Sequence, residues 1–131
     1  DITPMKPLDL PNVKTFQKSI EDQDFNEFLI EQGYKEFDAV LSDIAPNTTG
    51  IKERDQALSY ELCNMALQVA YTVLRNKGNL VMKVFEGPDT VKLLKQLQKR
   101  FSRVHLVKPM GSTKGSKESF LVAKEYSQMD K

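Results

Sequence analysis

Short, nearly continuous apolar runs recur along the chain and predict β-strands. They lie at residues 37–43, 79–87, 103–108 and 118–126. Runs of this kind are typical of parallel strands that are buried on both faces of a sheet. An alternation at residues 12–20 predicts one further, weak strand, whose apolar face stays undecided.

Apolar residues spaced three and four positions apart predict three helices, one before the first of these runs and two between later ones. The first covers residues 22–32 and stops at Gly33. The second is long and amphipathic, from Ala57 to Leu74, and is closed by the sequence NKG at 76–78. The third has Pro88 in its first turn. Its expected inner face consists of Val91, Leu94, Leu97 and Phe101.

The order strand, helix, strand, helix, strand predicts an α/β fold with a mostly parallel sheet and right-handed crossovers. The connection at residues 110–117 is too short for a helical crossover, so the last strand should run antiparallel to the one before it. No repeat or linker interrupts the pattern, and we expect residues 1–131 to form a single domain.

Composition fits a soluble, cytoplasmic and monomeric globular protein. The chain has 131 residues, of which 40% are hydrophobic. Its one cysteine, Cys63, excludes a disulfide framework and a cysteine-based zinc cluster, so no metal is expected. No apolar run approaches the roughly 20 residues of a membrane span. The first residue is Asp1 and not methionine, which leaves targeting open.

Charge is distributed unevenly along the chain. Residues 1–50 carry 4 Lys/Arg and 10 Asp/Glu, whereas residues 51–131 carry 15 and 8. Between Lys92 and Lys117 the charged side chains are all basic, which suits a polyanion such as RNA. Without further context, a solvated basic face is the simpler interpretation.

Three charged residues are expected to meet at one edge of the sheet. Asp43 ends a parallel strand, where ligands bind in open α/β sheets. Lys83 lies inside an apolar strand, and burying its ammonium would require an acidic partner. Glu118 begins the antiparallel strand, so it starts where the parallel strands end. A structural salt bridge is the alternative for one acid and one base, but three charges from three strands favour a functional site.

The other titratable or sulfur-containing side chains have simpler interpretations. Asp38, Glu86 and Glu125 are expected to be solvated residues in loops or at strand ends. His105 alternates with apolar neighbours and fits a surface or half-buried position. Cys63 lies on the apolar side of its helix and is expected to be part of the core.

Three sequence blocks together resemble the FtsJ/RrmJ family of ribose 2′-O-methyltransferases that act on large-subunit ribosomal RNA. They are LSDIAPNTTG, NLVMKVFEG and KPMGSTKGSKESFLVA, in this order. The resemblance implies a Rossmann-like methyltransferase sheet and S-adenosylmethionine as cofactor. It also implies that Asp43, Lys83 and Glu118 match three members of a catalytic tetrad. An RNA-binding domain of this fold without turnover is the alternative; a dinucleotide-binding domain is disfavoured because G-x-G-x-x-G is absent.

The resemblance also assigns binding residues. Asp1 matches the acid that binds the cofactor ribose, and Asp43 would lie between Lys83 and the cofactor. Near the adenine the chain departs from the family, which often has an aspartate there: either Ser19 replaces it, or Ile20 contacts the adenine through its backbone and by packing. Lys108, Lys114 and Lys117 are the implied RNA-binding residues. The family's remaining catalytic lysine and its glycine-rich cofactor loop would precede Asp1. We therefore expect the chain to be the C-terminal portion of a longer methyltransferase domain.

Overall fold

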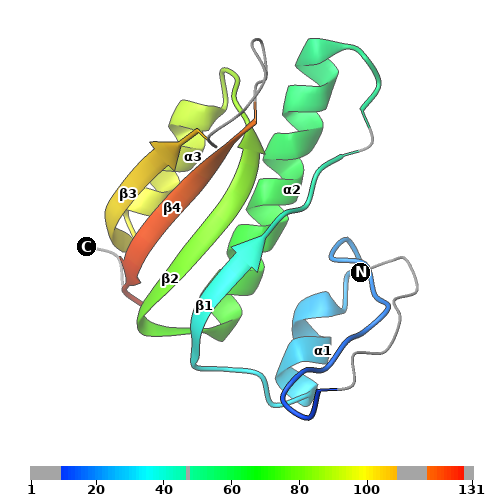
Figure 1. Cartoon of the computed structure of the whole chain (residues 1–131), viewed down its shortest axis with the longest axis vertical. Coiled ribbons are helices and arrows are strands. Elements are labelled where there is room, and N and C mark those ends of the chain that lie inside the picture. Colours follow the sequence, from blue (N-terminus) through cyan, green and yellow to red (C-terminus); the bar gives the residue numbers. More distant parts are fainter. Residues whose placement is uncertain (1–9, 47, 109–117, 129–131) are drawn as a thin grey trace.

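The computed structural model describes residues 10–46, 48–108 and 118–128, which form a four-stranded sheet and three helices (Figure 1). The strands are β1 (Phe37–Ser42), β2 (Leu74–Phe85), β3 (Phe101–Val107) and β4 (Glu118–Tyr126). The helices are α1 (Phe25–Glu31), α2 (Lys52–Val73) and α3 (Thr90–Gln98).

The strand order is β1-β2-β4-β3, and it confirms the predicted α/β class. β1 pairs with β2 in parallel, while β4 is antiparallel to both β2 and β3. β1, β2 and β3 therefore run in one direction, and the last strand lies between two of them in the opposite direction. As a result, β4 begins at the edge where β1, β2 and β3 end.

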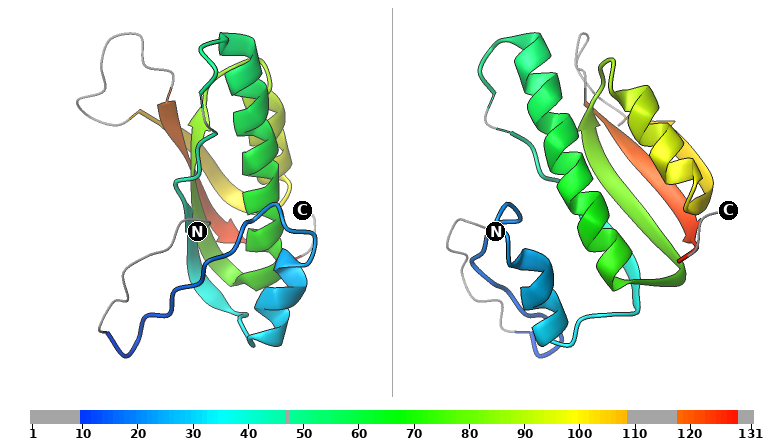
Figure 2. Two further views of the ribbon diagram at one scale, coloured as in Figure 1. Left: turned by 90° about the vertical axis from the view of Figure 1, so that its right-hand side faces the viewer. Right: turned by 180° about the vertical axis from the view of Figure 1, so that it is seen from behind.

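The hydrophobic core lies between the sheet and the two longer helices. Both α2 and α3 cover the same face of the sheet (Figure 2). Alternate strand residues point towards them, including the fully buried Leu80, Met82 and Leu121. Leu67 of α2 and Leu93 of α3 are also fully buried and complete this layer.

The prediction that β1 is buried on both faces was wrong. Leu41 is 77% exposed and Phe37 is 42% exposed, while Val40 is partly buried and packs against the core. The reason is positional. β1 is an edge strand, and α2 and α3 both lie on the other side of the sheet.

The junction between α2 and β2 differs from the prediction. α2 begins at Lys52 and ends at Val73, and the strand follows immediately, so the NKG sequence lies inside β2. Phe37 pairs with Leu74 but Ala39 pairs with Asn79, which makes residues 75–78 a bulge. Lys77 accordingly has a φ of 70°. Asn76 and Gly78 therefore lie in the bulge of β2 and do not end the helix.

The start of α3 also changes which residues it buries. Asp89 is the N-cap, so Pro88 precedes the helix and does not lie in its first turn. The inner face then consists of Thr90, Leu93 and Leu97, and Val91 is 56% exposed. The Thr90 hydroxyl accepts a hydrogen bond from the Gly87 N–H at 2.9 Å, and this contact fixes which side of α3 faces the sheet.

Residues 12–20 form no strand, so that prediction was wrong. Phe16 packs instead against Phe28, with ring centroids 5.1 Å apart, and against Tyr34. This use of Phe16 ties the segment to α1, which is shorter than predicted. Gly33 does follow that helix, with a φ of 79° that glycine adopts without strain. Among the described residues, no helix is long and apolar enough to cross a membrane.

Candidate functional site

Lys83 and Asp43 form an ion pair at the edge where the parallel strands end. Ser42 pairs with Met82, so the residues that follow each of them are also neighbours. The Lys83 Nζ lies 2.9 Å from Asp43 Oδ1. The lysine side chain is 16% exposed and the aspartate side chain is 78% exposed. The ammonium therefore reaches the surface while its apolar stem is covered.

Glu118 lies on the same face of the sheet as Lys83. Lys83 pairs directly with Phe120, and Phe85 pairs with Glu118. Side chains two residues apart on a strand share a face, so Lys83 and Glu118 are diagonal neighbours, about 7–8 Å apart at this register. The structure thus brings together Asp43, Lys83 and Glu118, as the sequence predicted.

Three polar side chains of α2 hold the end of β2 in place. The Gln56 Nε2 donates to the Glu86 carbonyl at 2.8 Å, and the Ser59 hydroxyl accepts from the Phe85 N–H at 3.0 Å. The Cys63 thiol donates to the Lys83 carbonyl at 3.3 Å. These residues lie on one helical face, and together they fix the backbone from Lys83 to Glu86. The sequence analysis missed this role for Gln56 and Ser59.

Gly87 leaves room for the Gln56 contact with Glu86. A Cβ at this position would lie 2.7 Å from Gln56 Cδ. Any larger residue would displace the carboxamide that binds the Glu86 carbonyl. The glycine of the KVFEG sequence therefore has a packing reason.

Cys63 acts as a hydrogen-bond donor because it is protonated. It is 4% exposed, and burial raises the pKa of its thiol to about 11, against a smaller lowering effect of the Ser59 hydroxyl. The prediction that Cys63 is a core residue is confirmed. A thiol of this pKa is a poor nucleophile at neutral pH.

Asp55 anchors the loop that follows Asp43. Its Oδ1 accepts hydrogen bonds from the Thr49 N–H and from the Thr49 hydroxyl, both at 2.8 Å. The same hydroxyl accepts from the Ile51 N–H at 3.1 Å. The Thr49 N–H is the largest influence and lowers the pKa of Asp55, although burial partly opposes it. A threonine shortly before an aspartate in the first helical turn was the available sequence signal.

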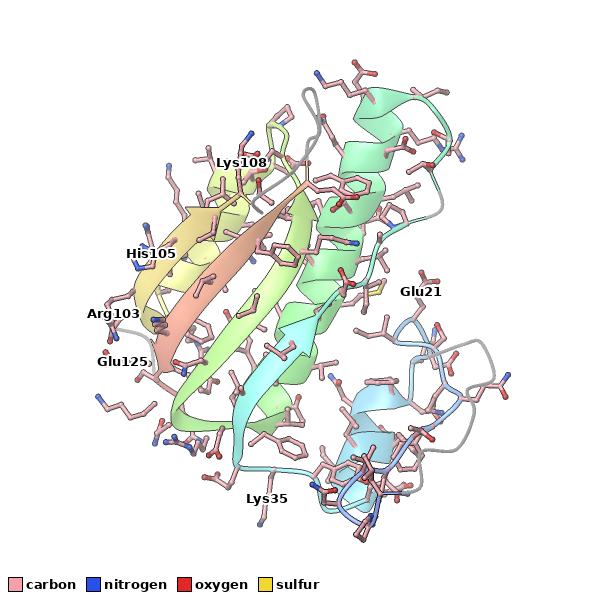
Figure 3. The ribbon with its side chains drawn as sticks, in the orientation of Figure 1. Glu21, Lys35, Arg103, His105, Lys108 and Glu125 are labelled. Carbon is pink, nitrogen blue, oxygen red and sulfur yellow. The ribbon has the colours of Figure 1, made fainter. Side chains whose placement is uncertain are left out.

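Glu86 is not the solvated residue that the sequence suggested. Its Oε2 accepts a hydrogen bond from the Ser119 hydroxyl at 2.7 Å, and Ser119 is fully buried. The same oxygen lies 3.3 Å from the Lys108 Nζ. Figure 3 shows Lys108 at the end of β3, close to where β4 begins. Asp38 and Glu125, which were also predicted to be solvated, do have exposed side chains. Asp38 forms an ion pair with Arg75, and Glu125 forms one with Arg103.

The cofactor-binding residues expected from the resemblance are only partly described. The Ser19 hydroxyl accepts from the Glu21 N–H at 3.1 Å, which makes a tight turn ahead of α1 (Figure 3). Ile20 is partly buried and packs against the core, so it can offer an apolar surface to a planar ring. Asp1, Lys114 and Lys117 lie outside the described residues.

A hollow of about 570 Å³ lies elsewhere, lined by residues 11–14 together with Phe16, Tyr34 and Phe37. Phe37 begins β1 and Asp43 follows its end, so this hollow and the ion pair are at opposite ends of the strand. The hollow is therefore separate from the Lys83 site. Within the described part of the chain, no group of three or more His, Cys, Asp and Glu side chains could hold a metal ion.

Comparisons with known proteins identify the family to which the chain belongs. The model of a family described as FtsJ-like methyltransferase matches residues 1–126. The ribosomal RNA large subunit methyltransferase E of Bdellovibrio bacteriovorus is 42% identical over 123 residues, covering 93% of this chain and 62% of that protein. The protein of the same name from a Psychrobacter species is 44% identical, covering 94% and 58%. The chain thus spans about three-fifths of the length of these relatives.

A solved structure supports the fold. It comes from Plasmodium falciparum, is described as a ribosomal RNA methyltransferase, and superposes with a TM-score of 0.81 at 26% identity. The match covers 95% of this chain and 69% of that one. The α/β sheet with its inserted antiparallel strand is therefore a methyltransferase-type sheet.

Proposed function

Because this chain belongs to the FtsJ-like methyltransferase family, we propose that it transfers a methyl group from S-adenosylmethionine to a ribose 2′-hydroxyl of large-subunit ribosomal RNA. The target is the ribose of a uridine, and residues 1–131 belong to a single methyltransferase domain. One observation carries the proposal. The largely covered Lys83 presents its ammonium 2.9 Å from Asp43 and on the same sheet face as Glu118.

Lys83 is assigned the central chemical role. A ribose hydroxyl is a weak nucleophile, and it must be aligned with the methyl carbon and the sulfur before transfer can occur. S-Adenosylmethionine supplies an electrophilic methyl group on a positively charged sulfur. The Lys83 ammonium, which Asp43 holds at 2.9 Å, would stabilise the developing alkoxide. Glu118 orients the same ammonium from its diagonal position.

Binding residues follow from the same assignment. Asp1 would accept hydrogen bonds from the cofactor ribose, and Ser19 and Ile20 would contact the adenine. Asp43 would face the positively charged sulfur as well as Lys83, and its exposed carboxylate is accessible for that role. Lys108, Lys114 and Lys117 would bind RNA phosphates. The protein would act as a monomer in the cytoplasm.

The test is methyl transfer from labelled S-adenosylmethionine to protein-free ribosomal RNA and to isolated large subunits. It is carried out with this chain and with this chain joined to the N-terminal residues of the Bdellovibrio relative. A labelled nucleotide that resists alkaline cleavage on its 3′ side would identify 2′-O-methylation. Lys83→Ala should lower kcat by about 10² to 10⁴ with cofactor affinity largely retained.

Lys124→Ala is the matched control, since Lys124 is an exposed lysine further along β4. It should keep methyl transfer within about threefold of the unmodified protein, as a surface substitution outside the site. Retained turnover in Lys83→Ala would refute the assignment. RNA binding without any methyl transfer, even by the extended chain, would favour a binding domain that has lost turnover.

A further inference from the structure

We propose that Glu86 is a positioning residue for the methyl-transfer site, because one carboxylate oxygen holds the start of β4 and so places Glu118 relative to Lys83. The inference rests on the proposed function, since it concerns the same site. Neither the family resemblance nor the charge pattern assigned a role to this glutamate.

The contacts that carry the inference join the ends of three strands at Glu86. Glu86 directly follows β2, Ser119 is the second residue of β4, and Lys108 directly follows β3. The Ser119 hydroxyl donates to Glu86 Oε2 at 2.7 Å, and the Lys108 Nζ lies 3.3 Å from the same oxygen. The Gln56 side chain holds the Glu86 backbone carbonyl at 2.8 Å. The backbone of Glu86 is therefore held in place by α2, and its carboxylate is positioned from there.

Burial makes the contact with Ser119 specific. Ser119 is 0% exposed, and it pairs with Val84 on the helix-covered face of the sheet. A buried hydroxyl needs a hydrogen-bond partner, and Glu86 provides one with a charged oxygen. Glu86 itself keeps its side chain 26% exposed.

The consequence for the site follows from strand geometry. Successive side chains on a strand point to opposite faces, so fixing Ser119 on the helix side fixes Glu118 on the open side. Glu118 pairs with Phe85, next to Glu86, and lies diagonal to Lys83. Glu86 and Glu118 thus lie on opposite faces of the same strand ends. Loss of the Ser119 contact would let the first residues of β4 separate from β2.

Besides its proposed contact with RNA, Lys108 has a structural role through its ion pair with Glu86 Oε2. Its ion pair with Glu86 holds the end of β3 beside the start of β4, and its side chain remains 63% exposed. An RNA phosphate can therefore still reach the ammonium. Because the ion pair is largely solvated, it should contribute less to the placement of β4 than the buried serine hydrogen bond does.

The first test separates these contacts by kinetics in the form of the protein that transfers methyl groups. Glu86→Ala and Ser119→Ala should each lower kcat about tenfold, with the KM for S-adenosylmethionine changed less than threefold. The double variant should be no worse than either single variant, because both remove one contact. Glu86→Gln should restore most of kcat, since its carbonyl oxygen can accept from Ser119. Lys108→Ala leaves that contact in place but removes an RNA-binding ammonium, so its effect should fall on the KM for RNA, with a smaller loss of kcat than in Ser119→Ala.

A second test does not depend on turnover. Hydrogen exchange of the backbone amides at the start of β4 is followed by NMR in the 131-residue chain. Without the serine hydrogen bond the first residues of β4 separate more often from β2, so Glu86→Ala and Ser119→Ala should speed the exchange of these amides at least about threefold. Glu86→Gln and Lys108→Ala should change this exchange less. If the protein transfers no methyl group but these amides exchange faster, the proposed function fails and the positioning role stands.

Three results would overturn the proposal. One is an unchanged kcat in Ser119→Ala. Another is multiplicative losses in the double variant, which would mean that the residues act independently. The third is unchanged amide exchange at the start of β4 in a folded Ser119→Ala protein, with folding checked by thermal unfolding.

Discussion

Replacing Lys83 with methionine separates the two interpretations of its ion pair. A structural salt bridge would make the variant unstable, whereas a functional site would leave the fold intact and remove activity. Methionine has an unbranched stem of similar size, so it should pack where the lysine stem does, between Val81 and Phe85 and opposite Phe120. The substitution therefore removes the ammonium with little change in packing.

The expected cost can be worked out from the two exposures. Asp43 is 78% exposed, so its carboxylate remains hydrated when Lys83 is lost. An ion pair with one such partner contributes about 0–1 kcal/mol, and a volume-conserving apolar exchange costs less than about 1.5 kcal/mol. The charged end no longer has to be held near apolar neighbours, which offsets part of this. We expect the free energy of unfolding to change by less than about 1 kcal/mol, out of the roughly 5–15 kcal/mol of a typical domain.

Urea unfolding followed by circular dichroism measures this change, with Asp43→Asn as the matched variant. Its cost should be equally small, and the coupling energy between the two substitutions should be below about 1 kcal/mol. A loss of about 3–5 kcal/mol in Lys83→Met would refute the reasoning, because that is the cost of breaking a truly buried pair.

The buried thiol of Cys63 should react with iodoacetamide at pH 8 about 100 times more slowly in the folded than in the unfolded protein, because burial raises its pKa to about 11. Equal rates in the two states would show that the folded thiol is accessible and ionised. Asp55 has a lowered pKa, so its contribution to stability is present above its ordinary value of 3.8 and is lost as the pH falls through the folded pKa. As the pH is lowered below 3.8, the free energy of unfolding should therefore fall more for the unmodified protein than for Asp55→Asn. The same fall with pH in both proteins would contradict the role of the Thr49 contact. Leu67→Ala removes a fully buried side chain and should lower the free energy of unfolding in urea by about 2–5 kcal/mol. Leu41 is 77% exposed, so Leu41→Ala should lower it by less than about 0.5 kcal/mol. Similar losses in both variants would contradict the position of the core described above.

Local patterns predicted the fold class and most elements correctly. The four apolar runs became β1, β2, β3 and β4, and the short connection to the last strand did produce an antiparallel neighbour. The family resemblance is confirmed by the match over residues 1–126. These successes rest on properties that neighbouring residues carry by themselves, namely periodicity and turn length.

Errors arose where a residue's environment depends on distant parts of the chain. The apolar run of β1 could not reveal that it lies at a sheet edge with Leu41 exposed. The alternation at residues 12–20 could not reveal that Phe16 packs with Phe28 of α1. In both cases the pattern was real, but the partner that would make it a buried strand does not lie beside it among the described residues.

The candidate site divides in the same way. The sequence alone placed Asp43, Lys83 and Glu118 at one edge, because strand direction follows from the order of elements and charged residues at strand ends are visible in the sequence. Only the tertiary structure decided that Gln56, Ser59 and Cys63 hold the lysine strand and that Glu86 joins Ser119 to Lys108. Those contacts join separate elements, most of them more than twenty residues apart. Their existence depends on the exact register and helix rotation that packing sets, which no local pattern encodes.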